Sequence, residues 1–276
     1  MEAFYKETDI EILIATRNRD SLDFLIPMFP SSHFSQFSIL IINQTKPETL
    51  LVSDYSNVRV INSFEKGVSK SRNLAIKNAK KEICLLADDD VVYFPNFEKR
   101  IISAFNLNHN ASILTFNHQR IGLNKPQNSS LKEYRHNKNS IWKVSSIEIA
   151  FKLDVIKNNK IDFDEYFGLE SYFETAEEFL FLRKCLELNI KAYFSPAIIV
   201  SHPLLSSGNK EGNDELIYAR AALIYKTKGK FAYLWLAKYV FFLHRNKYIQ
   251  KKECLEKYKV GMAGIYKYKE LVKLKL

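Results

Sequence analysis

The chain has 276 residues, of which 46% are hydrophobic and 26% charged, the composition of a globular protein with a sizeable core. No stretch reaches the roughly 18 apolar residues of a membrane-spanning helix, the charged start lacks the apolar segment of a signal peptide, and three scattered cysteines fit neither a disulfide framework nor a metal knuckle. We therefore expect a soluble protein of the reducing cytoplasm, and its formal net charge of +10 leaves nucleic acid, a phospholipid surface or anionic small molecules open as partners.

Short apolar runs alternate with helically spaced segments through the first 120 residues. The apolar runs predict strands at 10–15, 38–42, 58–61, 83–87 and 113–118. The segments between them predict helices at 20–29, 69–80 and 96–105, the second with Ser69 as its N-cap. Continuously apolar strands that alternate with helices form a parallel sheet covered on both faces, and such sheets bind ligands at the carboxyl ends of their strands. The functional site is therefore expected at that edge.

The second half of the chain is less regular. Residues 119–140 are rich in Asn, Lys and Ser and predict a surface loop over the site. Beyond this loop we expect a regular segment at 145–151, a helix ending at residue 158, a strong helix at 175–188, and short strands at 192–194 and 198–200. From residue 215 onward the pattern is helical, basic and aromatic.

The strongest chemical signal is the run Asp88-Asp89-Asp90, directly after the predicted strand at 83–87. Three neighbouring carboxylates repel one another and cannot all stay ionised without compensation. A divalent cation such as Mg²⁺ or Mn²⁺ supplies it, because hard cations bind carboxylate oxygens together with phosphate oxygens of a substrate. A solvated acidic turn is the alternative, less favoured at a strand end that points into the expected crevice.

The acidic run resembles the Asp-x-Asp element of the GT-A glycosyltransferases of family 2, which holds the metal and the donor diphosphate; Asp88 and Asp90 match its two carboxylates. Residues 67–75 (GVSKSRNLA) resemble the family's Gly…Ala-Arg-Asn segment, and 14–19 (IATRNR) resemble its Pro-Thr-Tyr-Asn-Arg. The chain has Asn43-Gln44-Thr45 where the family has Asp-Asp-x-Ser, a departure whose amides can still pair with a pyrimidine edge. The implied donor-binding residues are Ala15, Thr16, Arg17, Asn43, Gln44, Arg72, Asn73, Asp88 and Asp89.

Two segments of the second half extend the resemblance. Residues 163–168 (FDEYFG) resemble the family's Phe-Asp-Glu-x-Phe-Gly, and 176–183 (AEEFLFLR) resemble Gly-Glu-Asp-x-Asp/Glu-Phe-x-x-Arg. The family carries its general base in the second of these segments, which by position implies Glu178 as the base, with Glu177 contacting the acceptor or orienting its partner. A capping pair on an ordinary amphipathic helix is the alternative for these two glutamates.

A last match involves a histidine. Residues 193–202 (YFSPAIIVSH) resemble the family's Tyr-x-Pro-x-x-x-Val-x-His. In relatives this histidine approaches the metal or the diphosphate, so the implied metal ligands are Asp88, Asp90 and His202. A structural role for the imidazole is the alternative.

The resemblance covers roughly residues 8–204 and implies a GT-A fold, a Rossmann-like α/β architecture with a mostly parallel sheet flanked by helices. The catalytic domain is expected at 1–210, with a nucleotide-binding half at about 8–118 and an acceptor half at about 140–204. Residues 211–276 are expected to form a helical, basic C-terminal extension.

This extension combines aromatic and basic side chains. An apolar helix that runs from Phe231 to Phe242 is flanked by lysines and arginines, a composition that suits an anionic membrane surface. Packing of these helices back onto the sheet is the alternative. We expect the apolar face to pack and the basic rim to touch the membrane.

The function implied is inverting transfer of a sugar from a nucleotide-sugar, a UDP-sugar above all, to a glycan or lipid-linked saccharide in bacterial surface polysaccharide biosynthesis. The implied cofactor is Mn²⁺ or Mg²⁺, and the implied place is the cytoplasm or the inner face of the membrane. A sugar nucleotidyltransferase would need a glycine-rich loop after the first strand, and residues 15–20 contain no glycine. A nucleic-acid-binding module has no recognised motif here. A degenerate relative that binds a nucleotide-sugar or glycan without transfer is favoured only by the departure at Asn43-Gln44.

Overall fold

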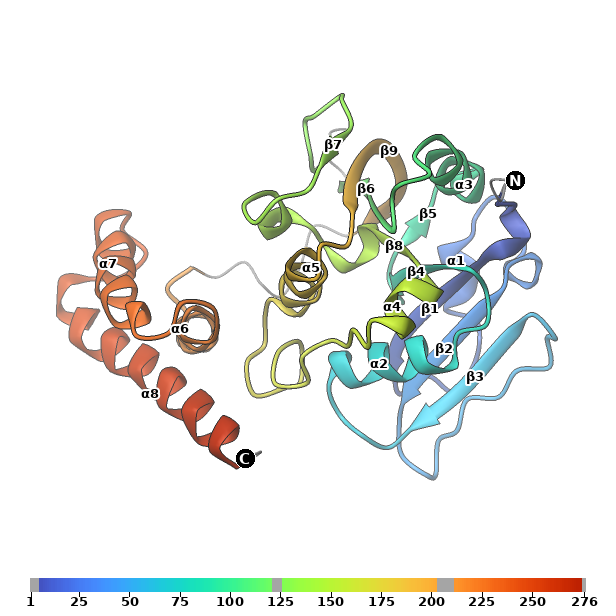
Figure 1. Ribbon diagram of the computed structural model, residues 1–276. Helices are drawn as coiled ribbons and strands as arrows, with labels where there is room; N and C mark the ends of the chain where they lie inside the picture. Colours follow the sequence, from blue (N-terminus) through green and yellow to red (C-terminus); the bar gives the residue numbers. More distant parts are fainter. Residues whose placement is uncertain (1–4, 121–125, 203–210, 275–276) are drawn as a thin grey trace. The chain divides into compact units, whose positions relative to one another are not determined.

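A computed structural model of the chain describes residues 5–120, 126–202 and 211–274 (Figure 1). Contacts divide the described residues into two compact units, one within Met1–Asp164 and Glu178–Leu204, the other within Glu165–Glu177 and Leu205–Leu276. We call them the sheet unit and the helical unit. The boundary expected near residue 210 falls in the segment 203–210, which lies outside the described residues, as does part of the loop expected at 119–140.

The sheet unit is built on a sheet whose described strands number nine, in the order β3-β2-β1-β4-β8-β6-β9-β5, with β7 paired to β9. The strands are β1 (Ile10–Arg17), β2 (Ile39–Gln44), β3 (Val58–Ser63), β4 (Ile83–Asp88), β5 (Val92–Tyr93), β6 (Ile113–Arg120), β7 (Tyr134–Arg135), β8 (Ile149–Lys152) and β9 (Ala192–His202). Neighbours from β3 to β4 are parallel, as are β6 and β9, while β5, β7 and β8 pair antiparallel. The predicted fold, a mostly parallel sheet flanked by helices, is confirmed.

Helices cover both faces of this sheet (Figure 1). They are α1 (Leu25–Met28), α2 (Val68–Asn78), α3 (Phe97–Leu107), α4 (Leu153–Asn158) and α5 (Glu177–Glu187), with short 3₁₀ turns η1 (Glu7–Asp9), η2 (Phe34–Gln36), η3 (Ser140–Lys143) and η4 (Ser146–Glu148). The side chains of Ile10, Ile12 and Ile14 point to the face covered by α1 and α3, in one core cluster. Because side chains alternate along a strand, the residues between them face the side on which α2 packs.

Two predicted helix features are wrong. The helix expected at 20–29 is only the four-residue α1. Pro27 is tolerated in the first turn of a helix but not in its interior, so no helix extends back to residue 20, and Phe29, which precedes Pro30, leaves the helical region. Ser69 is not the N-cap of α2, since Gly67 occupies that position with φ of 111° and Ser69 is buried within the first turn. A glycine is suited to that position because other residues strain at positive φ.

The two strands expected at 192–194 and 198–200 are one strand, β9, with Pro196 inside it. Its pairing with β6 shifts between Thr115↔Phe194 and Asn117↔Ile198. A proline cannot donate to a ladder of hydrogen bonds, but an irregular stretch of the pairing tolerates it. The proline therefore bends β9 rather than ending it.

The strand register aligns the carboxyl ends of β1, β2 and β4. Ala15 on β1 pairs with Asp88 on β4, and Thr16 pairs with Asn43 on β2. The carboxyl ends of β2, β1 and β4 consequently lie side by side at one edge of the sheet, as predicted for parallel strands.

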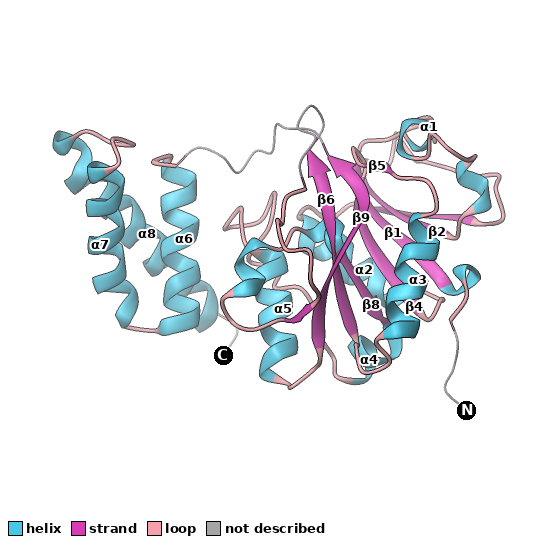
Figure 2. Cartoon of the chain, turned by 90° about the horizontal axis from the view of Figure 1, so that it is seen from above, coloured by secondary structure: helices cyan, strands magenta, loops and turns pink. Residues whose placement is uncertain are grey.

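The helical unit contains α6 (Asp214–Lys228), α7 (Phe231–Arg245), the turn η5 (Lys251–Glu253) and α8 (Cys254–Lys273), which lie side by side in Figure 2. The helical pattern predicted from residue 215 onward is confirmed. The core of the helical unit includes Ile217, Leu236, Leu243 and Ile265. None of the helices within the described residues combines the length and apolarity needed to cross a membrane.

Two glycines of α8 permit close helix packing in this unit. A Cβ at Gly264 would lie 2.1 Å from the carbonyl oxygen of Tyr218 on α6, and one at Gly261 would lie 2.4 Å from Leu236 on α7. Leucine side chains can rotate away, whereas a backbone carbonyl cannot. Gly264 therefore sets the spacing of α6 and α8.

We predict that Gly264→Ala destabilises the protein, although alanine favours an isolated helix over glycine by about 1 kcal/mol. Overpacking against fixed backbone costs roughly 1–3 kcal/mol, so the sign of the propensity effect is reversed. The free energy of unfolding from urea denaturation checks this. The neighbouring exposed Ala263→Ser is the control, with a loss of no more than about 0.5 kcal/mol from propensity alone. A stabilised Gly264→Ala variant would contradict the packing described.

Candidate active site

The carboxylates of the acidic turn point to different partners. Asp88, the last residue of β4, accepts a hydrogen bond from the Arg72 guanidinium at 3.1 Å and one from the Ser146 hydroxyl at 3.4 Å. Arg72 is buried on α2 and lies over the ring of Phe163, 5.5 Å from its centroid. A buried guanidinium beside a half-exposed carboxylate lowers the repulsion within the acidic turn.

The second carboxylate holds the loop that follows β1. Asp89 accepts a hydrogen bond from the Thr16 hydroxyl, and the Arg19 guanidinium contacts the same oxygen through Nε at 2.9 Å and a terminal nitrogen at 2.8 Å. The backbone NH of Asn18, a residue with φ of 51°, donates to the carbonyl of Gln44. The loop predicted to bind the donor is therefore tied to β4 and β2 at once.

The third carboxylate meets the histidine at the end of β9. His202 Nε2 lies 3.3 Å from Asp90 Oδ1, so residues far apart in the sequence meet as the resemblance implies. The hydrogen bond with His202 holds the pKa of Asp90 below its ordinary value, although partial burial acts in the opposite direction. Asp90 is the most exposed of the three aspartates of the acidic turn.

The donor atoms of this pair are those that a divalent cation binds. A carboxylate oxygen and an imidazole nitrogen 3.3 Å apart could both turn toward one ion, whose other ligands would be phosphate oxygens and water. Among the described residues no group of three or more His, Cys, Asp or Glu side chains is arranged to hold a metal. The residues present therefore fit a cation held by Asp90 and His202 and completed by substrate, while Asp88, engaged by Arg72, remains a predicted third ligand.

The predicted donor-binding amides make internal hydrogen bonds. Asn43 is buried, accepts from the backbone NH of Arg19, and donates to the Arg19 carbonyl and to Asn62. Gln44 donates to the carbonyl of Gly67 at 2.8 Å. These contacts shape the edge of the site, and direct contact of either amide with a nucleotide base stays a prediction.

Asn73 links two of the matched segments. Its amide accepts from the NH of Phe163 at 2.7 Å and donates to the Phe163 carbonyl at 3.0 Å. This pairing fixes the start of segment 163–168 beside α2. Since Arg72 lies over the Phe163 ring, both residues of the Arg-Asn pair contact Phe163, the first residue of the matched segment.

A buried ion pair behind the acidic turn was not expected from the sequence. Glu148, at the end of η4, accepts from the backbone NH of Ser145 and lies 2.8 Å from Nδ1 of His118 on β6. Burial raises the pKa of Glu148, and the contact with His118 counteracts that rise. The pair holds η4 in place, and η4 brings Ser146 to Asp88. The capping-box spacing Ser145-x-x-Glu148 could have placed Glu148 at this turn, but not its pairing with His118.

The predicted general base lies at the start of α5. Ala176 has φ of 64°, and the helix begins at Glu177, so both glutamates occupy the first turn, where the helix dipole stabilises negative charge. Glu177 is buried and Glu178 half-buried. Phe179 stacks on Trp142 of η3 with ring centroids 3.7 Å apart, which anchors the first turn to the sheet unit. The boundary between the two units passes between the glutamates, and their predicted roles stay predictions.

The remaining predicted residues lie on β1. Ala15 pairs with Asp88 in the sheet, and Arg17 is the exposed last residue of the strand. The sheet edge thus brings together Thr16, Arg19, Asn43, Arg72, Asp88, Asp89, Asp90, Ser146 and His202. Arg19 and Ser146 were not among the residues predicted for the site.

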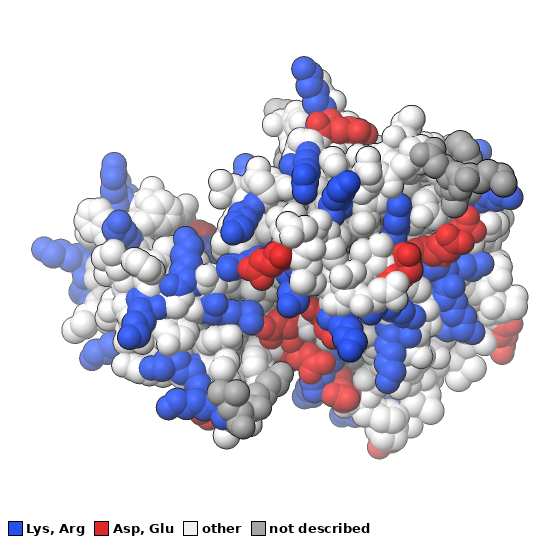
Figure 3. Space-filling model, in the orientation of Figure 1, with Lys and Arg blue, Asp and Glu red and all other residues white. Residues whose placement is uncertain are grey.

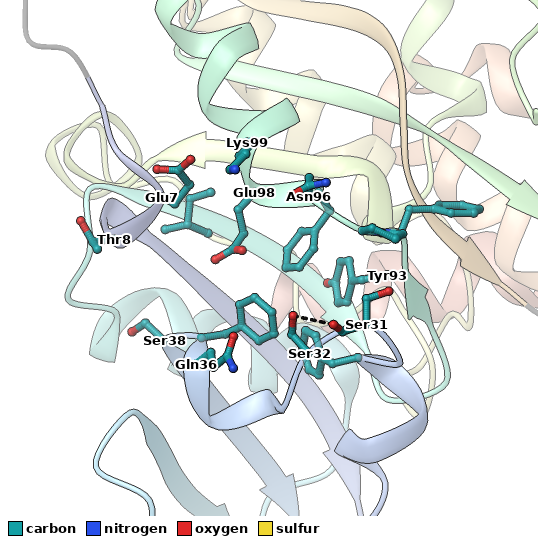
Figure 4. Close-up of a pocket in the computed structure, with 16 residues that line it drawn as sticks. Glu7, Thr8, Ser31, Ser32, Gln36, Ser38, Tyr93, Asn96, Glu98 and Lys99 are labelled. Atoms are coloured by element: carbon teal, nitrogen blue, oxygen red, sulfur yellow. Dashed lines mark hydrogen bonds between the residues drawn. The ribbon is translucent and has the colours of Figure 1, made fainter.

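A pocket of about 490 Å³ opens at the other end of the strands (Figure 4). It is lined by Ile10 and Ser38, where β1 and β2 begin, and by the first turn of α3. Its aromatic wall stacks Phe29 on Tyr93 and Tyr93 on Phe97. None of the residues predicted for the active site lines it.

One carboxyl group of this pocket titrates near neutral pH. Burial raises the pKa of Glu98 from 4.5 to about 7, with a smaller contribution from the charge of Glu7 and a small opposing one from Lys99. The fold therefore disfavours the ionised form of Glu98. The protonated form of Glu98 favours the folded state relative to the ionised form. This contribution to stability is fully present below pH 4.5 and is lost as pH rises through about 7.

We predict that Glu98→Gln stabilises the protein at pH 8 relative to the wild type and changes its stability least near pH 4.5. The difference in unfolding free energy should grow between these values and level off above pH 8. Denaturation across a pH series checks this, with the exposed Glu133→Gln as control. A difference that is independent of pH would show that Glu98 titrates normally.

Comparison with known proteins agrees with this arrangement. The sequence profile described as glycosyl transferase family 2 matches residues 12–164, more than half of the chain. A search of curated proteins finds no match.

Solved structures with the same fold include S. aureus TarS. TarS 1-349 in complex with UDP-GlcNAc superposes with a TM-score of 0.56 at 15% identity, over 94% of this chain and 81% of that one. The complex of the same fragment with UDP gives 0.54 at 18% identity, over 90% and 79%. The chain covers 46% of the longer TarS chain, less than half of its length, with a TM-score of 0.54 at 18% identity.

The profile match runs from Ile12 in β1 past β8 and covers the residues gathered at the acidic edge except His202, and the TarS structures share the fold. The chain therefore belongs to glycosyl transferase family 2 and is a GT-A glycosyltransferase.

Proposed function

We propose that this glycosyltransferase moves a sugar from a UDP-sugar to a glycan or lipid-linked saccharide, with inversion at the anomeric carbon. The observation that carries the proposal is the acidic edge, where Asp88, Asp89 and Asp90 each engage a different element of the sheet unit. Such an edge suits a diphosphate, because it combines a buried guanidinium with carboxylates able to share a cation. The TarS complexes with UDP and UDP-GlcNAc support uracil as the base.

In this proposal the donor lies across the ends of β2, β1 and β4. The end of β1, with Ala15, Thr16 and Arg17, borders the nucleoside, and Asn43 and Gln44 shape the wall beside it. Arg72 supplies positive charge near the diphosphate. Asp90 and His202 would hold Mn²⁺ or Mg²⁺, with Asp88 as the predicted third ligand, and the ion would neutralise charge on the departing nucleotide diphosphate.

Transfer needs a base on the acceptor side. We assign this role to Glu178, whose carboxylate accepts the proton of the acceptor hydroxyl as its oxygen forms a bond to the anomeric carbon. The bond from that carbon to the diphosphate oxygen breaks on the opposite face, and the nucleotide diphosphate leaves. Glu177 orients the acceptor or its neighbouring carboxylate. Both lie in the first turn of α5, where the helix dipole favours negative charge.

The proposal extends to place and pathway. A lipid-linked acceptor would bring the enzyme to the inner face of the membrane, with peripheral contact through the C-terminal helices, and would suit bacterial surface polysaccharide biosynthesis. The second candidate function is a degenerate relative that binds a nucleotide-sugar or glycan without transfer. The internal hydrogen bonds of Asn43 and Gln44 favour it, since they engage the amides in place of a base.

We predict that UDP with Mn²⁺ raises the thermal stability of the protein more than GDP, dTDP or CDP. A ligand at about 100 times its Kd stabilises the native state by about 2.7 kcal/mol. In Asp90→Asn the metal-dependent part of this shift should disappear, while the exposed Asp54→Asn behaves as wild type. Thermal unfolding with each nucleotide, with and without Mn²⁺, measures this. No shift with any nucleotide would overturn the donor site.

We also predict that Glu178→Gln lowers kcat by about 10²–10⁴-fold, because an amide cannot accept the proton. Stabilisation by UDP and Mn²⁺ should be unchanged, which separates loss of chemistry from loss of donor binding. Glu187→Gln at the other end of α5 is the matched control and should retain turnover. Release of UDP measures the rate. An unaffected kcat would remove Glu178 as the base, and a wild type that binds UDP without any release would favour the degenerate relative.

A further inference from the structure

The helix α7 is apolar on two opposite faces. Its inner face packs Ala232, Leu236, Tyr239 and Leu243 into the core of the helical unit. A second stripe of large apolar residues faces away from that core, with exposed fractions of 75% for Phe231, 59% for Leu234, 64% for Phe241 and 47% for Phe242. A helix of a folded domain ordinarily has one apolar face, so the second requires another explanation.

Cations border and interrupt this outer stripe. Lys238 and Arg245 lie on it at helical spacing from Leu234 and Phe241, while Lys228, Lys230 and Lys247 lie near the ends of the helix. All five are exposed, and no ion pair with any of them occurs within the described residues. The carboxylates Glu211, Asp214 and Glu270 pair instead with Arg220, Lys257 and Lys267.

The segment that forms α7 and its flanks carries charge of one sign only. Between Glu215 and Glu253 the chain has no acidic residue and nine lysines and arginines. Residues 211–276 contain fifteen Lys and Arg and six Asp and Glu, a formal charge of +9 out of the chain's +10. In Figure 3 the surface over α6, α7 and α8 carries many basic side chains and few acidic ones.

We propose that the outer face of α7 docks on an anionic phospholipid surface, with Phe231, Leu234 and Phe241 inserted at the boundary between headgroups and acyl chains. The helix would lie in the plane of the interface. Its cations would reach the lipid phosphates, because the long stems of Lys238 and Arg245 allow their charged ends to rise to the headgroups. This differs from the contact expected from the sequence, in which only the basic rim touches the membrane.

Charge decides between this occupant and a second copy of the chain. A symmetric dimer through the same stripe would bring five unpaired cations of each copy together, with no carboxylate on α7 to offset them. An anionic lipid surface meets the same cations with opposite charge, so each Lys or Arg near the surface adds to the attraction. Single-stranded nucleic acid could neutralise them too, but it binds in grooves that follow the backbone, whereas this stripe is the outer face of one helix.

The inference rests on the proposed function only for its purpose, the approach to a lipid-linked acceptor. Docking itself needs no sugar transfer and can be measured separately. If vesicle binding fails and nucleotide binding persists, the docking face is wrong and the donor site stands. The opposite result would remove the donor site and leave the docking face.

The test is flotation of the full chain with vesicles of phosphatidylcholine alone and of phosphatidylcholine with phosphatidylglycerol, at physiological and high salt. We expect binding to the anionic vesicles that high salt weakens. Replacing Phe231, Leu234 and Phe241 together by Ser should lower the partition into the vesicles at least about tenfold, because three apolar side chains then no longer leave water for the lipid. Lys238→Gln with Arg245→Gln should remove much of the salt dependence.

Controls keep the outcome interpretable. Leu107→Ser with Leu131→Ser removes two equally exposed leucines from the sheet unit and should leave vesicle binding unchanged. Circular dichroism and stabilisation by UDP with Mn²⁺ confirm that each variant is folded. The proposal is overturned if the wild type ignores anionic vesicles, if the triple variant binds them as well as the wild type, or if the stripe instead drives dimerisation or binding of a single-stranded oligonucleotide.

Discussion

The repulsion among Asp88, Asp89 and Asp90 is the constraint on which the site depends. Three consecutive carboxylates at the end of a buried strand cannot share one environment, and the fold separates them by giving each its own cation or donor. Arg72 approaches from α2, Arg19 from the loop after β1, and His202 from the end of β9. The acidic turn therefore acts as the point at which three elements, distant in sequence, are held at one edge of the sheet.

Two asparagines support the site through hydrogen bonds to the backbone. Asn43 shapes the loop after β1, and Asn73 holds the backbone of Phe163 from both sides. These are polar residues placed at strand ends and helix starts, where contact with a ligand is the first expectation. Here their amides satisfy buried backbone groups, and the ligand-facing surface is left to charged side chains. A substitution at either asparagine would consequently disturb stability and the site together.

The two units of the chain differ in their charge. The sheet unit carries the acidic edge, whereas residues 211–276 carry nearly all of the net positive charge. In the helical unit the glycines of α8 bring the helices close enough to bury the inner face of α7. That packing leaves the outer stripe of Phe231, Leu234 and Phe241 exposed among unpaired cations. Because the inner face of α7 packs into the core of the helical unit, its outer apolar face is the one left exposed.

The sequence by itself determined the strands β1 to β4, their parallel arrangement and the edge at which the site lies. Continuous apolar runs permit only buried strands, and the run of three aspartates marks the carboxyl end of one of them. It also identified most of the residues at that edge, because the matched segments each follow a strand or begin a helix. What it could not determine was the pairing of these residues, since Asp90 with His202 and Asp89 with Arg19 depend on side-chain direction and not on spacing.

Tertiary structure alone decided the remaining features. The sequence predicts two short strands at 192–194 and 198–200, but pairing with β6 accommodates Pro196 in one strand. The pair His118–Glu148 is joined across 30 residues by the sheet, and no local pattern connects its two members. For α7 the sequence showed an apolar helix with basic flanks, and only packing against α6 and α8 determined which side chains are buried and which remain exposed. The spacing of apolar residues in the sequence shows which of them share a face of a helix. Which element packs against each face depends on the folded chain.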